Sequence, residues 1–126
     1  MPRKPWTPEQ TPDSFWELIE KAGRDRHKLR ELLLPLSRGE LYDFHVLFGR
    51  LASMLMGPPY AAPDATEDAE EDIAEWVVAQ GKDYYFDVYK NPEKTPHTLP
   101  NKNGIGFVST VLNVYHHLFG EDLSYA

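Results

Sequence analysis

The chain has 126 residues, a net charge of −7 and no cysteine. The length suits one domain, and 41% hydrophobic residues supply a core, which excludes disorder over the whole chain. Without cysteine there is no disulfide, thiolate nucleophile, Cys-ligated zinc or iron–sulfur cluster. We expect no signal peptide and no membrane span, and therefore a cytoplasmic protein.

The negative charge is concentrated in the second part of the chain. Residues 1–56 carry nine Lys/Arg and eight Asp/Glu, a net charge of +1, whereas residues 57–126 carry four and twelve, a net charge of −8. An acidic half repels a phosphate backbone, so we expect no nucleic-acid partner. A basic protein surface is the partner that fits this charge.

The N-terminal residues predict an arm followed by a helix. Four prolines in residues 1–12 predict an extended arm. A helix is expected over about 12–22, with Thr11 as its cap and Pro12 in its first position. Its apolar residues recur at helical spacing: Phe15, Leu18, Ile19 and Ala22.

Two further helices are predicted before residue 57. Asp25 caps the first, over about 26–34, and Pro35 ends or bends it. Ser37 and Glu40 form a capping-box pattern ahead of an apolar run, which predicts a long helix over about 38–56.

The Gly- and Pro-rich connector 57–63 cannot continue a helix. A fourth helix is expected from residue 64 or 66 to about 80, followed by Gly81 and a short helix that ends at Asn91-Pro92. Residues 91–106 read as a loop. Residues 106–119 favour a helix by spacing, although their β-branched content would also suit a strand.

Together these patterns predict an all-α fold, a bundle of five or six helices with Trp16 and Trp76 in or beside the core. The predicted boundaries are an extended arm over 1–12, a helical domain over 13–120 and a tail over 121–126.

Five short motifs follow one another over about residues 13–93: FWELI at 15–19, LSRGEL at 36–41, FHVLF at 44–48, WVVAQG at 76–81 and NP at 91–92. In this order they resemble a bacterial family catalogued as domain of unknown function 4240. The resemblance implies a helical fold and assigns no activity. Family members often carry a Gly-rich, Ser-Asp-Asp stretch before the tryptophan helix, whereas residues 60–68 differ here.

A dense run of carboxylates precedes Trp76 without any Lys or Arg among them. It is either a solvated face that favours the helix dipole or a contact surface for a basic partner. The candidate partner-binding residues are Glu67, Asp68, Glu71, Asp72 and Glu75.

Gln80 falls on the apolar side of the same helix, where a buried amide needs hydrogen-bond partners. It either ties a loop to the core or faces a pocket. The candidate pocket residues are Trp16, His45, Trp76, Gln80 and Tyr84.

No catalytic residue, metal ligand set or cofactor is predicted, because none of the five histidines or the serines lies in a catalytic or metal-binding motif. We therefore expect a small acidic interaction protein without enzymatic activity, immunity- or antitoxin-like or an assembly subunit. The alternative is a small-molecule binder or enzyme with a cleft around Gln80. The oligomeric state does not follow from the sequence.

Overall fold

The computed structural model describes residues 5–61 and 63–123. The described residues form helices and turns without any strand, and none of their helices is long and apolar enough to cross a membrane. The all-α prediction is confirmed, and the last segment is a helix. The helices are α1 Asp13–Ala22, α2 Arg26–Leu33, α3 Arg38–Ser53, α4 Glu67–Ala79, α5 Lys82–Lys90 and α6 Phe107–Phe119, with 3-10 turns η1 Pro8–Gln10 and η2 Pro92–Lys94.

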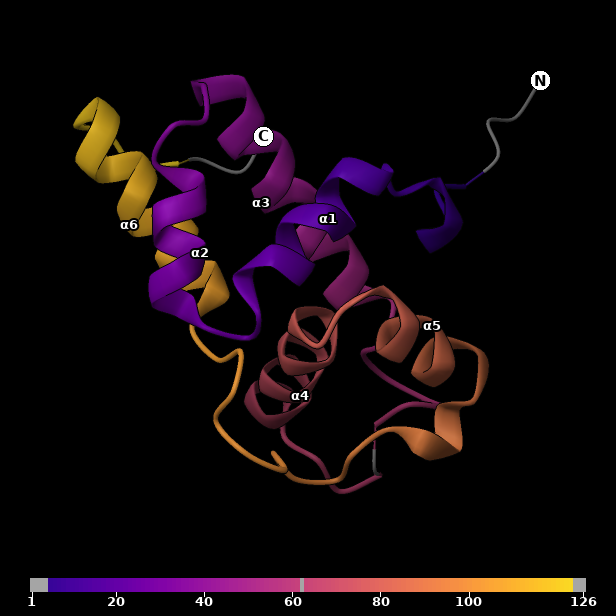
Figure 1. Cartoon of the computed structure of the whole chain (residues 1–126). Helices are drawn as coiled ribbons and strands as arrows, with labels where there is room; N and C mark the ends of the chain where they lie inside the picture. Colours follow the sequence, from indigo (N-terminus) through magenta and orange to yellow (C-terminus); the bar gives the residue numbers. More distant parts are fainter. Residues whose placement is uncertain (1–4, 62, 124–126) are drawn as a thin grey trace.

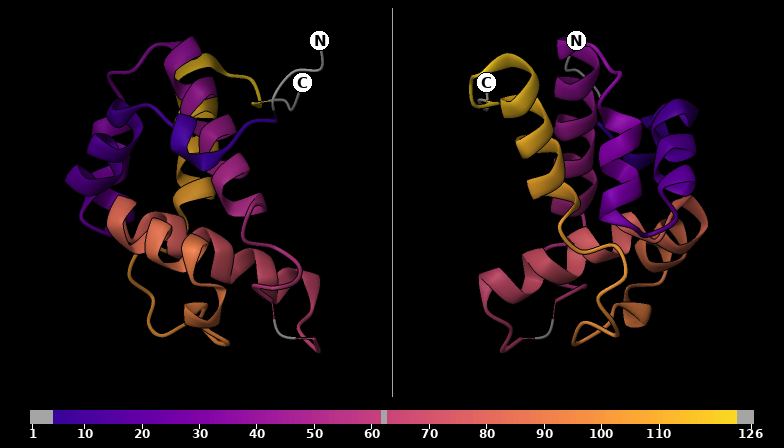
Figure 2. Two further views of the ribbon diagram at one scale, coloured as in Figure 1. Left: turned by 90° about the vertical axis from the view of Figure 1, so that its right-hand side faces the viewer. Right: turned by 60° about the vertical axis from the view of Figure 1, so that its left-hand side comes forward.

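The helices form two groups that meet at the core. α1, α2, α3 and α6 stand side by side, while α4 lies across their lower ends with α5 next to it (Figures 1 and 2). α2 and α3 both pack against α6, and α3 packs against α4. The loop between η2 and α6 runs beneath α4 (Figure 1). This crossing places the ends of α1, α4 and α5 close together.

Two of the predicted caps, Asp25 and Ser37, are present, and Thr66 supplies one that was not predicted. Asp25 Oδ1 accepts a hydrogen bond from the His27 amide at 2.9 Å. Ser37 Oγ accepts from the Glu40 amide at 3.2 Å, and the Ser37 amide donates to the Glu40 carboxylate at 3.0 Å, so the predicted capping box forms. Thr66 Oγ1 caps α4 at the Ala69 amide, at 3.2 Å. Each of these bonds satisfies an amide that the first turn of a helix leaves unpaired.

Two local predictions were wrong. Thr11 does not cap α1; Pro12 is the residue before its first turn, and the Thr11 side chain is buried among described atoms that offer it no hydrogen bond. α3 ends at Ser53 rather than near residue 56, because the amides of Leu55 and Met56 bond to the carbonyls three residues back, Ala52 and Ser53, which tightens the chain into turns.

The two ends of the described chain pack onto the domain. Part of the predicted arm forms η1, and Trp6 packs half-buried against the core with the Arg50 guanidinium 5.8 Å from its ring. At the other end, Glu121 pairs with Arg38 at 2.8 Å and Leu123 is buried. Residues 1–4 of the predicted arm and 124–126 of the predicted tail lie outside the described residues.

Aromatic rings join the helices inside the core. Both indoles predicted to lie there, Trp16 and Trp76, are buried. The Trp16 ring centroid is 5.6 Å from that of Tyr85, which links α1 to α5. Phe15 stacks on Phe44 at 5.1 Å and links α1 to α3. Aromatic pairs at these separations stabilise a core beyond the area that they bury.

One buried hydrogen bond fixes α5 to α3. Tyr85 is fully buried, and its hydroxyl donates to the Leu51 carbonyl at 2.7 Å. Leu51 belongs to the last turn of α3, where carbonyls have no partner within the helix. The tyrosine supplies the missing donor. Burial raises the pKa of the Tyr85 hydroxyl, so it stays protonated and remains a donor.

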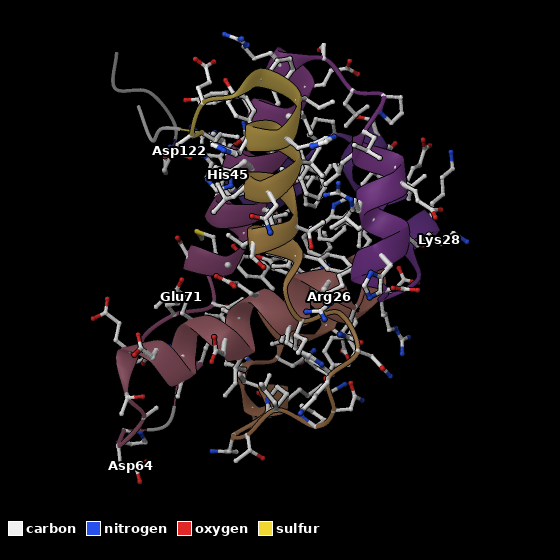
Figure 3. The ribbon with its side chains drawn as sticks, turned by 90° about the vertical axis from the view of Figure 1, so that its left-hand side faces the viewer. Arg26, Lys28, His45, Asp64, Glu71 and Asp122 are labelled. Atoms are coloured by element: carbon white, nitrogen blue, oxygen red, sulfur yellow. The ribbon has the colours of Figure 1, made fainter. Side chains whose placement is uncertain are left out.

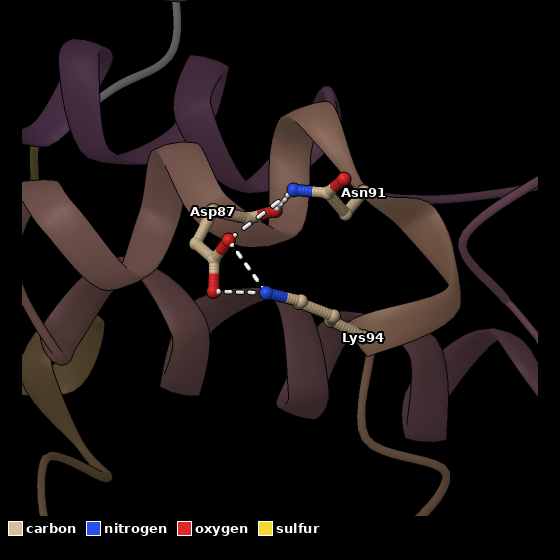
Figure 4. Close-up of polar contacts among 3 residues, drawn as sticks. All are labelled: Asp87, Asn91 and Lys94. Atoms are coloured by element: carbon tan, nitrogen blue, oxygen red, sulfur yellow. Dashed lines mark hydrogen bonds and ion pairs between the residues drawn. The ribbon is translucent and has the colours of Figure 1, made fainter.

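Asp87 accepts the hydrogen bonds that hold the end of α5 (Figure 4). Its carboxylate accepts from Lys94 Nζ at 2.9 and 3.0 Å, and its backbone carbonyl accepts from Asn91 Nδ2 at 2.9 Å. These bonds hold η2 against α5, so the predicted stop at Asn91-Pro92 is also the point where the chain reverses.

We expect Tyr85→Phe to lower the free energy of unfolding by about 1–3 kcal/mol, because the buried Leu51 carbonyl loses its donor. Urea denaturation followed by far-ultraviolet circular dichroism measures this change. Tyr84→Phe is the matched control, since the Tyr84 side chain is exposed, and we expect its effect to stay within about 0.5 kcal/mol. Equal effects of the two substitutions would contradict the role of this hydrogen bond.

Candidate functional site

The predicted carboxylates lie together on α4. We call Glu67, Asp68, Glu71, Asp72 and Glu75 the acidic strip. The first four are exposed and Glu75 is half-buried; Figure 3 labels Glu71 among them. α4 contains no Lys or Arg. In the first turn, the negative charges also favour the positive end of the helix dipole, so the solvated-face interpretation holds for that turn.

Within the described residues, no member of the acidic strip forms an ion pair with a cation. Burial, then the hydrogen bond and charge of Glu71, and last the charge of Asp72, raise the pKa of Glu75 to about 7. Glu75 borders a hollow of about 180 Å³ whose lining includes Trp76 and Phe107. These apolar rings hold water away from the carboxylate. The strip is therefore crowded with like charge.

Gln80 ties a loop to the end of α4, as the first of its two interpretations requires. Its Nε2 donates to the carbonyls of Trp76 and Asn103, both at 3.0 Å. A side-chain amide has two hydrogens to donate, so only its oxygen is left for another partner. A Cβ at Gly104 would lie 2.8 Å from the Ala79 Cβ and 3.2 Å from Gln80 Nε2. Glycine is therefore required for this approach.

Gln80 also lines a groove of about 400 Å³ between the end of α1 and the start of α5. We call this hollow the Gln80 groove. Its volume falls at the lower end of the range of ligand sites. The groove combines exposed charged residues with the buried apolar Ile19 and Ala79, and its lining residues are Ile19, Glu20, Gly23, Arg24, Ala79, Gln80, Asp83 and Tyr84.

Of the five candidate pocket residues, Gln80 and Tyr84 line the Gln80 groove. Trp76 supports it from behind, with its ring edge-on to Tyr84 at 5.5 Å. Trp16 is enclosed in the core. His45 is buried on α3, and burial lowers its pKa, which favours the neutral imidazole. Figure 3 shows His45 beside α6, far from α4, so the five residues do not form one pocket.

The charge of the Gln80 groove comes from three residues that were not predicted to belong to a site, Glu20, Arg24 and Asp83. No local pattern marks them, because each is an ordinary surface residue in the sequence. They meet only because α1 ends where α5 begins.

A second groove, of about 740 Å³, was not foreseen either. It lies over α1, α3 and the chain that follows α2, and its floor includes Leu18, Leu36 and Leu47, with Glu17 and Arg50 among its charged neighbours. The sequence feature that indicates this groove is the broad apolar stripe of the 38–56 segment. α1 and α2 cover only part of that stripe, so its outer edge stays half-buried.

No set of three or more His, Cys, Asp or Glu in the described residues is arranged to hold a metal ion. His116 Nδ1 lies 3.2 Å from Asp122 Oδ1, so this histidine has a local carboxylate neighbour at the end of α6. The arrangement is that of an exposed helix end.

No protein-family model matches the chain, and neither a curated protein nor a solved structure matches it. The resemblance to domain of unknown function 4240 therefore stays a prediction.

We expect Glu75→Gln to stabilise the protein at high pH. The folded state raises the Glu75 pKa from 4.5 to about 7, so the folded protein binds more protons than the unfolded chain between these values, and stability falls as pH rises. Solvent screening reduces the full linkage value of about 1.4 kcal/mol per pKa unit, so at pH 8 we expect a gain of about 1 kcal/mol.

Urea denaturation at pH 8 and pH 4 measures this difference. It should disappear at pH 4, where Glu75 is protonated in both states. Glu17→Gln is the matched control, because Glu17 is an exposed carboxylate in the middle of α1. A stabilisation by Glu75→Gln that persists unchanged at pH 4 would show that relief of charge is not its cause.

Proposed function

We propose that this protein is a non-enzymatic interaction protein whose acidic strip binds a basic surface on a protein partner. Immunity proteins and antitoxins, which neutralise a basic effector, and subunits of larger assemblies are the classes that this chemistry suits. The proposal places the protein in the cytoplasm, with which a chain without cysteine is compatible.

The observation that carries the proposal is the acidic strip itself, five carboxylates on one helix that make no ion pair with a cation in the described part of the chain. Complementary charge on a partner would steer encounter and fix the register of the complex. The net charge of −8 over residues 57–126 strengthens the long-range attraction.

Glu75 gives such a contact more than surface attraction. A half-buried carboxylate beside Glu71 and Asp72 is unfavourable in the free protein, because like charges and burial both oppose its ionisation. A Lys or Arg side chain placed beside it would favour the ionised form and lower its pKa. Part of the binding free energy would thus come from relief of repulsion within the strip.

The expected test is a charge reversal. Glu71→Lys with Asp72→Lys should weaken binding to the native partner by about tenfold or more, since losing 1.4 kcal/mol of attraction is one factor of ten. The partner is first isolated from the native extract by affinity capture on the wild-type protein and identified by mass spectrometry. Its affinity for each variant is then measured by calorimetry.

Glu17→Lys with Glu31→Lys is the matched control, because it changes net charge equally on exposed residues of α1 and α2. Circular dichroism checks that both double variants are folded. Equal affinity of the strip variant and the wild type would reject the acidic strip as the contact. If the control variant lost as much affinity for the partner, the loss would come from the change in net charge and not from the acidic strip.

A further inference from the structure

We propose that the Gln80 groove is a binding site for a small zwitterion, a free α-amino acid, held by its ammonium group at Glu20 and Asp83 and by its carboxylate at Arg24. This site goes beyond the proposed function. It shares α4 with the acidic strip but no residue of it.

The charges of the groove point to a ligand with both signs. Glu20 and Asp83 are carboxylates from α1 and α5, and Arg24 is a guanidinium from the turn between α1 and α2. Among the described residues these three groups form no ion pair, with one another or with any neighbour. Lys82, the adjacent cation, pairs instead with Asp13 at 3.5 Å. Opposite charges that share a groove without pairing can each take one end of a zwitterion.

Gln80 supplies a fixed acceptor. Since both of its amide hydrogens are held by the Trp76 and Asn103 carbonyls, its oxygen alone is left to receive a hydrogen bond. An ammonium group has three hydrogens to donate. Glu20, Asp83 and Gln80 together offer three acceptors in one groove, which matches that number.

The Glu20 carboxylate lies close to the start of α5. A Cβ built on Gly81 would lie 3.1 Å from Glu20 Oε1, and Gly81 itself has a φ of +111°. Glycine therefore lets the carboxylate approach the start of α5, where the helix dipole is positive.

Arg24 is in an unusual backbone conformation. Its φ of +64° makes it the non-glycine residue with positive φ in the described chain, directly after Gly23 at +59°. Residues other than glycine rarely adopt this region, and such strain gathers at functional sites. Arg24 lines the groove, and a guanidinium there can donate two parallel hydrogen bonds to a carboxylate. An amine without a carboxylate would bring a second positive charge near the Arg24 guanidinium and offer it no partner. A zwitterion therefore suits the groove better.

The ring of Tyr84 leaves room for a ligand side chain. It is 38% exposed and is braced edge-on by Trp76. The groove also contains the buried apolar Ile19 and Ala79. An aliphatic or aromatic amino-acid side chain can lie over this surface while its charged ends reach the charged residues of the groove.

The test is an NMR titration of the whole ¹⁵N-labelled chain with each natural L-amino acid. We expect at least one to shift the amides of Gly23, Arg24, Asp83 and Tyr84 with a Kd of about 0.1–1 mM, as weak binding by a small ligand implies. For that amino acid, both its N-acetyl form and its carboxamide should bind at least tenfold more weakly, because each lacks one of the two charges.

Arg24→Gln and Asp83→Asn should each weaken binding at least tenfold, while Lys28→Gln, which removes an exposed cation of α2 outside the groove, should leave it unchanged. Thermal unfolding verifies that each variant is folded, and Asp83→Asn decides the matter if Arg24→Gln does not fold. The proposal is overturned if no amino acid shifts these amides, if either blocked form binds as well as the free amino acid, or if Asp83→Asn binds normally.

Discussion

The hydrogen bond from the Tyr85 hydroxyl to the Leu51 carbonyl is the constraint on which the arrangement of this protein depends. It joins the last turn of α3 to α5 within a core that admits no water to replace it. An unpaired carbonyl there would cost more than the bond contributes. α4 precedes α5 directly in the chain and lies across the lower ends of the upright helices (Figure 2).

That crossing decides where the polar chemistry lies. α4 leaves the core at its N-terminal half, where the acidic strip faces solvent, and enters it at its C-terminal half, where Trp76 is buried. Gly81 then turns the chain into α5 beside the end of α1. One helix thus carries an electrostatic surface at one end and one wall of the Gln80 groove at the other.

The two candidate sites differ in how their charges are balanced. The acidic strip contains one sign of charge, and its repulsion is relieved by protonation of Glu75 or by an external cation. The Gln80 groove contains both signs, carried on three separate elements, and is a concave hollow of small-molecule size. The two proposed sites share no residue.

The sequence by itself determined the helices. Apolar residues at three- and four-residue spacing, with Asp25 and Ser37 as predicted caps, act over one or two turns and predict the helices, although the β-branched content of residues 106–119 left a strand open for the last one. The acidic strip could also be predicted from the sequence, because its residues are neighbours on one helix. Thr11 failed as a cap because several residues around Pro12 can begin a helix, and only packing selects one.

Only the tertiary structure decided which distant residues meet. Tyr85 and Leu51 are 34 positions apart, and nothing in the sequence of either segment indicates that the two residues are in contact. The end of α1 lies beside the start of α5, which brings Glu20, Arg24 and Asp83 together in one groove. Trp16 and His45 lie on helix faces that point away from this groove. Spacing along the chain specifies a helix face, but the angle at which two faces cross is set by how the side chains of both fill the space between them.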